Sequence, residues 1–84
     1  MIKAIAIDDE PIALKVIENF CHEIETITLE KTFGNAEEGL KYLKKFPTDI
    51  IFLNNEMPNL NGIDLYKQIK QNTLVIFIAS RPDY

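Results

Sequence analysis

The chain has 84 residues and a net charge of −4, with nine Lys and Arg against thirteen Asp and Glu. This length allows one domain with a modest core, and the acidic balance disfavours a nucleic-acid-binding module. The one cysteine, Cys21, excludes an internal disulfide and a cysteine-rich zinc site. No apolar run approaches the roughly 20 residues of a membrane span, and acids interrupt the first one too early for a signal peptide. We therefore expect a small soluble cytoplasmic domain that does not itself contact nucleic acid or membrane.

The first quarter of the chain predicts a strand and then a helix. Residues 2–7 are rich in Ile and end in acids, which is typical of a buried strand. Residues 10–24 repeat apolar side chains every three or four positions, which predicts an amphipathic helix with Asp9 as its cap. Its apolar stripe comprises Ile12, Val16, Ile17, Phe20 and Ile24.

The next two segments repeat this alternation. Residues 27–33 alternate apolar and polar side chains, which indicates a half-exposed strand. Residues 36–46 predict a second amphipathic helix, with Phe46 facing inward and Pro47 ending the helix.

The last segments complete a strand–helix alternation along the whole chain. Residues 49–54 include four consecutive apolar side chains, as in a central parallel strand that is covered on both faces. Residues 63–70 predict a third helix, and residues 73–79 predict another buried strand. Strict alternation with short connections indicates an α/β fold, a parallel sheet with helices on both faces.

Ligands of such sheets bind at the carboxyl ends of the strands. The side chains at these ends are Asp8, Asp9, Asn54, Asn55, Ala79 and Ser80. Adjacent carboxylates repel each other unless a cation lies between them, and hard oxygen ligands suit Mg²⁺. The alternative is that Asp9 caps the helix and Asp8 is a solvated acid of the turn. A phosphate-cradling loop is excluded because this turn has no glycine.

Two motifs stand out at these strand ends. One is Ile-Asp-Asp-Glu-Pro at residues 7–11, and the other runs from Asp49 to Gly62 and contains Asn-Asn-Glu-Met-Pro. With this spacing, the two motifs resemble those of the receiver domain of two-component response regulators. The similarity extends along the whole chain and is greatest to receivers that precede LytTR-type DNA-binding domains. The resemblance implies a flavodoxin-like (CheY-like), three-layer, doubly wound parallel sheet with strand order 2-1-3-4.

The resemblance also implies roles for individual residues. Asp8 and Asp9 match the acid pair that holds Mg²⁺, which the backbone carbonyl of Glu56 completes. Asn54 matches the phosphoacceptor carboxylate, which receives phosphate from a histidine kinase. Ala79 matches the Ser/Thr switch residue that bonds the phosphoryl group.

This chain departs from the pattern at both phosphoryl-handling positions. Asn54 has a neutral amide, which is a poor nucleophile, so we expect no acyl phosphate there. The loss of one negative charge should also leave at most weak Mg²⁺ binding. Ala79 cannot donate the switch hydrogen bond, and Ser80, one residue later in a strand, should point to the other side. A shift of one residue in the alignment would restore a hydroxyl.

The family's receiver has five strands and five helices, whereas this chain ends after its fourth strand. We therefore expect residues 1–84 to be the N-terminal, incomplete part of a receiver. The uncharged run from Leu74 to Ile78 would then be an edge strand, which invites pairing with another chain. We expect self-association through this edge and the uncovered sheet face, or else a fragment that is ordered only within a longer protein.

Our main interpretation is a phosphorelay receiver that cannot be phosphorylated, has no catalytic residue, and acts by contact with a histidine kinase or another signalling protein. One alternative is an engineered Asp-to-Asn form, or a fragment, of an active phospho-accepting regulator that controls transcription. An alternative of another class is a small Mg²⁺-dependent phosphatase-like enzyme with Asp8 as nucleophile and Glu10 as second acid. Its loop is too short to form a substrate cap.

Overall fold

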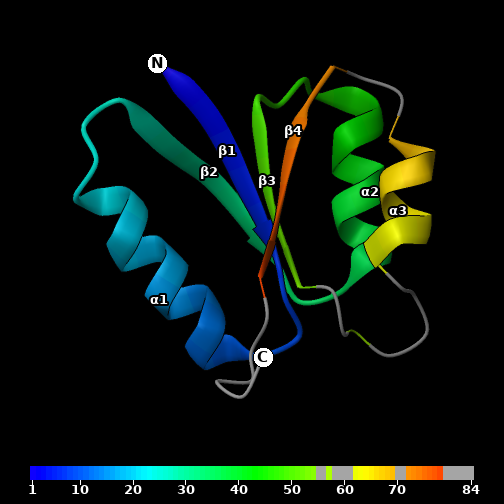
Figure 1. Ribbon diagram of the computed structural model, residues 1–84, viewed down its shortest axis with the longest axis horizontal. Helices are drawn as coiled ribbons and strands as arrows, with labels where there is room; N and C mark the ends of the chain where they lie inside the picture. Colours follow the sequence, from blue (N-terminus) through cyan, green and yellow to red (C-terminus); the bar gives the residue numbers. More distant parts are fainter. Residues whose placement is uncertain (55–56, 58–61, 70–71, 79–84) are drawn as a thin grey trace.

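The computed structural model describes residues 1–54, 57, 62–69 and 72–78. Strands and helices alternate along these residues, as the sequence predicts (Figure 1). The elements are β1 (Ile2–Ile7), α1 (Pro11–His22), β2 (Ile27–Phe33), α2 (Ala36–Lys45), β3 (Ile50–Asn54), α3 (Gly62–Gln68) and β4 (Leu74–Ile78).

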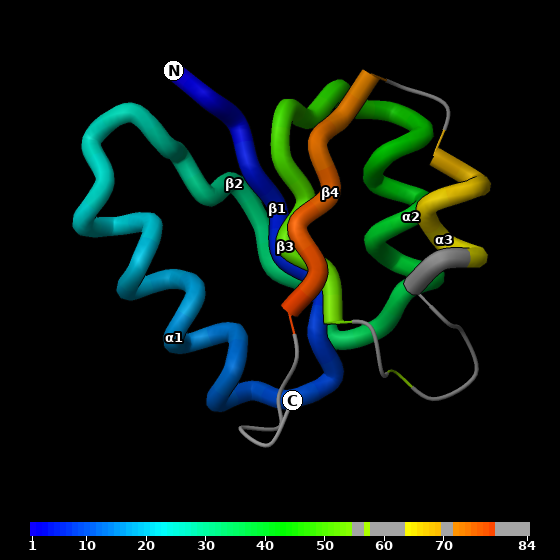
Figure 2. The backbone as a smooth tube through the Cα atoms, in the orientation of Figure 1, coloured from blue at the N-terminus to red at the C-terminus, as the bar shows by residue number. Residues whose placement is uncertain are grey.

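The described strands form one parallel sheet in the order β2-β1-β3-β4. Helix α1 lies on one side of this sheet, and α2 and α3 lie on the other (Figures 1 and 2). These three layers confirm the predicted doubly wound α/β class and its strand order. The strand order reverses beside β1, because the chain passes from β1 to β2 on one side and later returns to β3 on the other. This point is where a sheet of this type presents a crevice for ligands.

Alternate residues of β1 and β3 feed two separate apolar clusters. Ile5 and Ile7 face α2 and α3, where Leu43 and Leu65 are buried against them. Ala4 and Ala6 face α1 and contribute to a second cluster, whose other buried members are Ile17, Cys21 and Phe52. Because both faces of β1 are covered, its last four residues are completely buried, and the strand is fixed in place from both sides.

The expected cap of the first helix is wrong. Helix α1 begins at Pro11, with Glu10 at the capping position and no side-chain hydrogen bond at that cap. The backbone N–H of Glu10 instead donates to Oδ1 of Asp8 at 2.9 Å. Helix α2, by contrast, has a regular cap, in which Asn35 Oδ1 accepts from the backbone N–H of Glu38 at 2.9 Å. The carboxylates of Asp8 and Asp9 thus do not cap α1; they are directed toward Asn54 at the end of β3.

Three parts of the apolar pattern are also exposed where the sequence predicts burial. In the α1 stripe only Ile17 is buried, and Ile12 remains 78% exposed, because α1 packs on β1 and β2 and turns its outer side away from the sheet. Phe46 lies just past the end of α2 and is half exposed. Strand β4 is an edge strand, so Leu74 and Phe77 remain largely open to solvent.

A glycine sets how closely α2 approaches the sheet. A Cβ atom added at Gly39 would collide with Cδ1 of Ile7 and lie 2.8 Å from its Cγ1. Such overpacking costs about 1–3 kcal/mol, which exceeds the roughly 1 kcal/mol that alanine gains over glycine in a helix.

We expect Gly39→Ala to lower the free energy of unfolding measured by urea denaturation. Gly34→Ala is the control, because a Cβ there meets nothing within 4 Å; equal stability of the two variants would contradict the prediction.

Candidate functional site

The candidate site lies where β1 and β3 end side by side. Ile7 pairs with Leu53 at the end of the ladder, so the next residue of each strand, Asp8 and Asn54, reaches the same spot. Both are buried, at 1% and 2% exposure, although both are polar. Asp9 is exposed and begins the connection to α1. The parallel pairing therefore brings Asn54 next to Asp8 and Asp9, which lie 46 and 45 positions earlier in the sequence.

The amide group of Asn54 bridges the two carboxylates. Its Nδ2 donates to Oδ1 of Asp8 at 3.0 Å and to Oδ1 of Asp9 at 3.3 Å. Oδ1 of Asp8 also accepts the backbone N–H of Glu10, and the backbone N–H of Asp8 donates to the carbonyl of Phe33 at 3.0 Å. A planar amide nitrogen carries two hydrogens, and here both have an acceptor. The site is thus a hydrogen-bonded cluster around a neutral donor.

The other oxygen of Asp8 has no such partner. Oδ2 is buried and lacks a hydrogen bond within the described part of the chain, a situation that usually marks a site for water or an ion. The bridging group between Asp8 and Asp9, however, is a donor, whereas Mg²⁺ requires oxygen ligands. As arranged here, the pocket does not fit a Mg²⁺ ion between the two acids unless Asn54 turns away.

The structure brings together three of the residues singled out in the sequence, namely Asp8, Asp9 and Asn54. Glu56 and Ala79, and with them the expected metal-binding carbonyl and switch position, lie outside the described residues. The roles of all these residues in metal or phosphoryl binding stay predictions. Sequence reasoning missed the bridge itself; the signal that could have indicated it is the pairing of two acids with an amide at neighbouring strand ends.

A second feature is an apolar groove between α1 and the β3–β4 half of the sheet. It has a volume of about 510 Å³ and is lined mainly by aliphatic and aromatic side chains. Phe20 meets Phe52 edge to face there, with ring centroids 6.4 Å apart. The lining residues are Glu10, Ile12, Ala13, Val16, Ile17, Phe20, Phe52, Ile76 and Ile78. The part of the stripe of α1 that the sheet leaves uncovered forms one wall of this groove.

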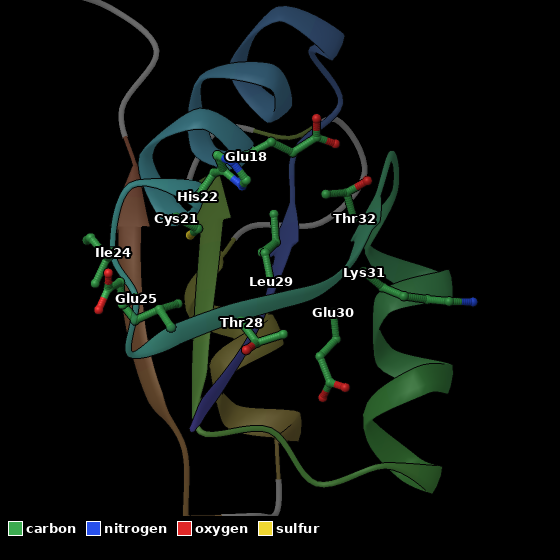
Figure 3. Close-up of a pocket in the computed structure, with 11 residues that line it drawn as sticks. Glu18, Cys21, His22, Ile24, Glu25, Thr28, Leu29, Glu30, Lys31 and Thr32 are labelled. Carbon is green, nitrogen blue, oxygen red and sulfur yellow. The ribbon is translucent and has the colours of Figure 1, made fainter.

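Another hollow, of about 540 Å³, lies along the edge strand β2 and the second half of α1 (Figure 3). Glu18, Glu25, Glu30 and Lys31 point in different directions around it and converge on no common point. Among the described residues, no group of three or more His, Cys, Asp or Glu side chains is placed to hold a metal ion. Burial raises the pKa of the Cys21 thiol above its ordinary value, which disfavours a reactive thiolate. We assign this hollow no chemistry.

Within the portion of the chain that the structure covers, the helices are too short or too polar to traverse a lipid bilayer.

Comparison with known proteins places this geometry in a family. The family model described as the response regulator receiver domain matches residues 4–83. The probable C4-dicarboxylate response regulator DctR of Bacillus subtilis is 31% identical over 84 residues, covering 96% of this chain and 37% of that protein. The chain thus spans little more than a third of this curated relative.

Solved structures agree in fold. The response regulator domain of Thermotoga maritima CheB superimposes with a TM-score of 0.85 at 27% identity, covering 95% of this chain and 61% of that one. The RcsB response regulator of Salmonella typhimurium gives a TM-score of 0.83 at 26% identity, covering 95% and 43%; RcsB is also known as two dimers bound to two parallel DNAs. On the family match, the sequence relatives and the shared fold, this chain belongs to the response regulator receiver domains of two-component systems.

Proposed function

We propose that this receiver domain transmits a signal by protein contact and does not accept a phosphoryl group. The observation that carries the proposal is the identity and setting of Asn54, which is buried at the end of β3 with its amide directed at Asp8 and Asp9. A carboxylate attacks phosphorus through an anionic oxygen, whereas an amide oxygen is neutral and its nitrogen is not basic. The pocket therefore lacks a nucleophile at the position that the family resemblance assigns to the acceptor.

The surrounding acids do not replace the missing nucleophile. Asp8 is 1% exposed, and its Oδ1 already accepts hydrogen bonds from Glu10 and Asn54. A nucleophile needs a free, accessible oxygen within reach of its substrate. This burial supports a non-enzymatic role and counts against the phosphatase-like alternative, which requires Asp8 to attack a substrate.

The partner that fits this role is a histidine kinase or another signalling protein that recognises a receiver surface. The relative BtsR of Escherichia coli is a transcriptional regulatory protein, and by analogy a protein that contains this domain would control transcription. Whether Asn54 is natural or was introduced in place of Asp leaves this chemistry unchanged, because the amide has the same reactivity in either case.

The first test is phosphorylation by a small donor. We expect incubation of the chain with acetyl phosphate and Mg²⁺ to add no phosphoryl group, since residue 54 offers no carboxylate. Intact mass spectrometry before and after incubation measures this directly. A mass gain of one phosphoryl group on the unaltered chain would refute the proposal.

Asn54→Asp is the matched variant for this experiment. It restores the carboxylate at the end of β3 with almost no change in side-chain shape. We expect this variant to gain a phosphoryl group that acid, base and hydroxylamine all remove, as for an acyl phosphate, if the described part of the pocket suffices to bind the donor. A gain in both proteins would locate the acceptor elsewhere.

The contact surface that we propose for self-association is the apolar groove together with the outer edge of β4. Among the described strands, β4 pairs only with β3, so its other edge has unpaired N–H and C=O groups. The sequence of β4, Leu-Val-Ile-Phe-Ile, contains no charge to discourage pairing. An edge of this kind matches a second copy of itself when two chains meet antiparallel about a twofold axis.

The groove adds hydrophobic surface beside that edge. Ile12, Val16, Phe20 and Ile76 are between 38% and 78% exposed and all four line it. Exposed apolar side chains gathered at one groove are typical of surfaces at which proteins associate. A second copy of the chain would cover this patch and pair the edge strand in one interface.

We therefore expect the mass measured by light scattering to rise from 9.7 kDa toward twice that value with increasing concentration. Ile76→Lys should abolish the rise, because it puts a charge on the edge strand within the groove. Tyr66→Lys is the control, since Tyr66 is similarly exposed but lies on α3, on the other side of the sheet. A mass that stays monomeric at high micromolar concentration would overturn this interface and leave the groove to another segment or partner.

A further inference from the structure

We infer that the Asn54 amide takes the place of a divalent cation in this pocket and holds the carboxyl ends of β1 and β3 together without metal. This inference deepens the proposed function, since it treats the pocket as one that receives no phosphoryl group. It concerns the folded state and metal dependence of the domain rather than its reactivity. The two can therefore fail separately.

The distances around Asn54 support the inference that its amide takes the position of a cation. One nitrogen, Nδ2 of Asn54, lies 3.0 Å from Oδ1 of Asp8 and 3.3 Å from Oδ1 of Asp9. A cation shared by two carboxylates would also contact one oxygen of each. The amide differs because its two partial positive charges are fixed to β3 by a covalent side chain. It is present in every copy of the protein, at any metal concentration.

The charges explain why a donor is needed here. Asp8 is buried, and the exposed Asp9 follows it directly; both carboxylates lie within hydrogen-bond distance of the same Asn54 nitrogen, so they are close together. Like charges at such a distance destabilise each other unless something positive lies between them. An aspartate at position 54 would add a third carboxylate to the same spot, and the added repulsion would favour a bound cation or protonation of one of the acids. The asparagine removes that charge and supplies two hydrogen-bond donors instead.

A cation would have to displace this bridge in order to bind between the acids. Displacement would break the hydrogen bonds from Nδ2 to Asp8 and Asp9 and turn a group that is 2% exposed, and the loss of these bonds carries a cost. The cation would gain the oxygens of Asp8 and Asp9 but no carboxylate from residue 54. Binding of Mg²⁺ should thus be weak, and the fold should not depend on it.

The experiment is thermal unfolding of the whole chain with and without millimolar Mg²⁺. We expect the unfolding midpoint of the unaltered chain to change little on addition of Mg²⁺. Asn54→Asp should unfold at a lower temperature without metal, by roughly 4 °C or more for a domain of this size. Mg²⁺ should return most of that loss, since a cation that binds only the folded state stabilises it.

Two further variants separate the bridge from a general effect of added charge. Asn19→Asp makes the same chemical change on the exposed side of α1 and should neither lower the midpoint appreciably nor respond to Mg²⁺. Asp9→Asn combined with Asn54→Asp restores the charge and supplies a new amide beside the carboxylates. This double variant should regain metal-free stability and lose the Mg²⁺ response.

Two outcomes would overturn the inference. One is an unaltered chain whose midpoint rises with Mg²⁺ as much as that of Asn54→Asp. The other is an Asn54→Asp variant that is as stable as the unaltered chain in the absence of metal. If Asn54→Asp folds only in Mg²⁺, removal of the metal with a chelator should unfold it, and that result supports the bridge. Neither outcome depends on whether acetyl phosphate modifies residue 54, so the proposed function is judged independently.

Discussion

The pairing of β1 with β3 is the constraint on which the rest of this domain depends. β1 is hydrogen-bonded on both edges and covered on both faces, so its last residues cannot shift without disturbing both apolar clusters. The register Ile7 to Leu53 then determines that the residues after them share one location. This register places the polar side chains of Asp8 and Asn54 at that location, and both are buried. The hydrogen bond between them offsets part of the loss of water.

The carboxylates of Asp8 and Asp9 lie close together at this location and repel each other in the folded state. A buried carboxylate with an adjacent acid is unfavourable, and the solutions available are a cation, a donor or protonation. This chain places a donor, the Asn54 amide, between the two acids. In the function that we propose, the same choice also removes the nucleophile, so the amide bridge and the loss of phosphoryl acceptance would have a single chemical origin. Such a domain would keep the receiver shape, and its pocket would not respond to a phosphoryl donor.

Much of this could be predicted from the sequence because the informative signals are local and periodic. The apolar run of residues 50–53 marked a central strand, and the acids and amides at strand ends marked the site. The exposure of Ile12 and Phe20 could not be predicted, since periodicity shows that a helix has an apolar side but not how much of that side the sheet covers. Likewise, Asp9 has the right chemistry for a helix cap. Only the three-dimensional arrangement shows that its carboxylate is turned toward Asn54.

The uneven covering of the sheet gives its two faces different roles. On the α2–α3 face, Leu43 and Leu65 are buried over the middle of the sheet, and Gly39 allows α2 to pack close to Ile7. On the other face, α1 covers β1 and β2, and Phe52 and Ile76 border an apolar groove. The α2–α3 face stabilises the fold, because its apolar side chains are buried away from water. The second retains apolar surface that another polypeptide can still bury. In the function that we propose, where Asn54 supplies no acceptor carboxylate, this second surface is the one through which the domain would make its signalling contact.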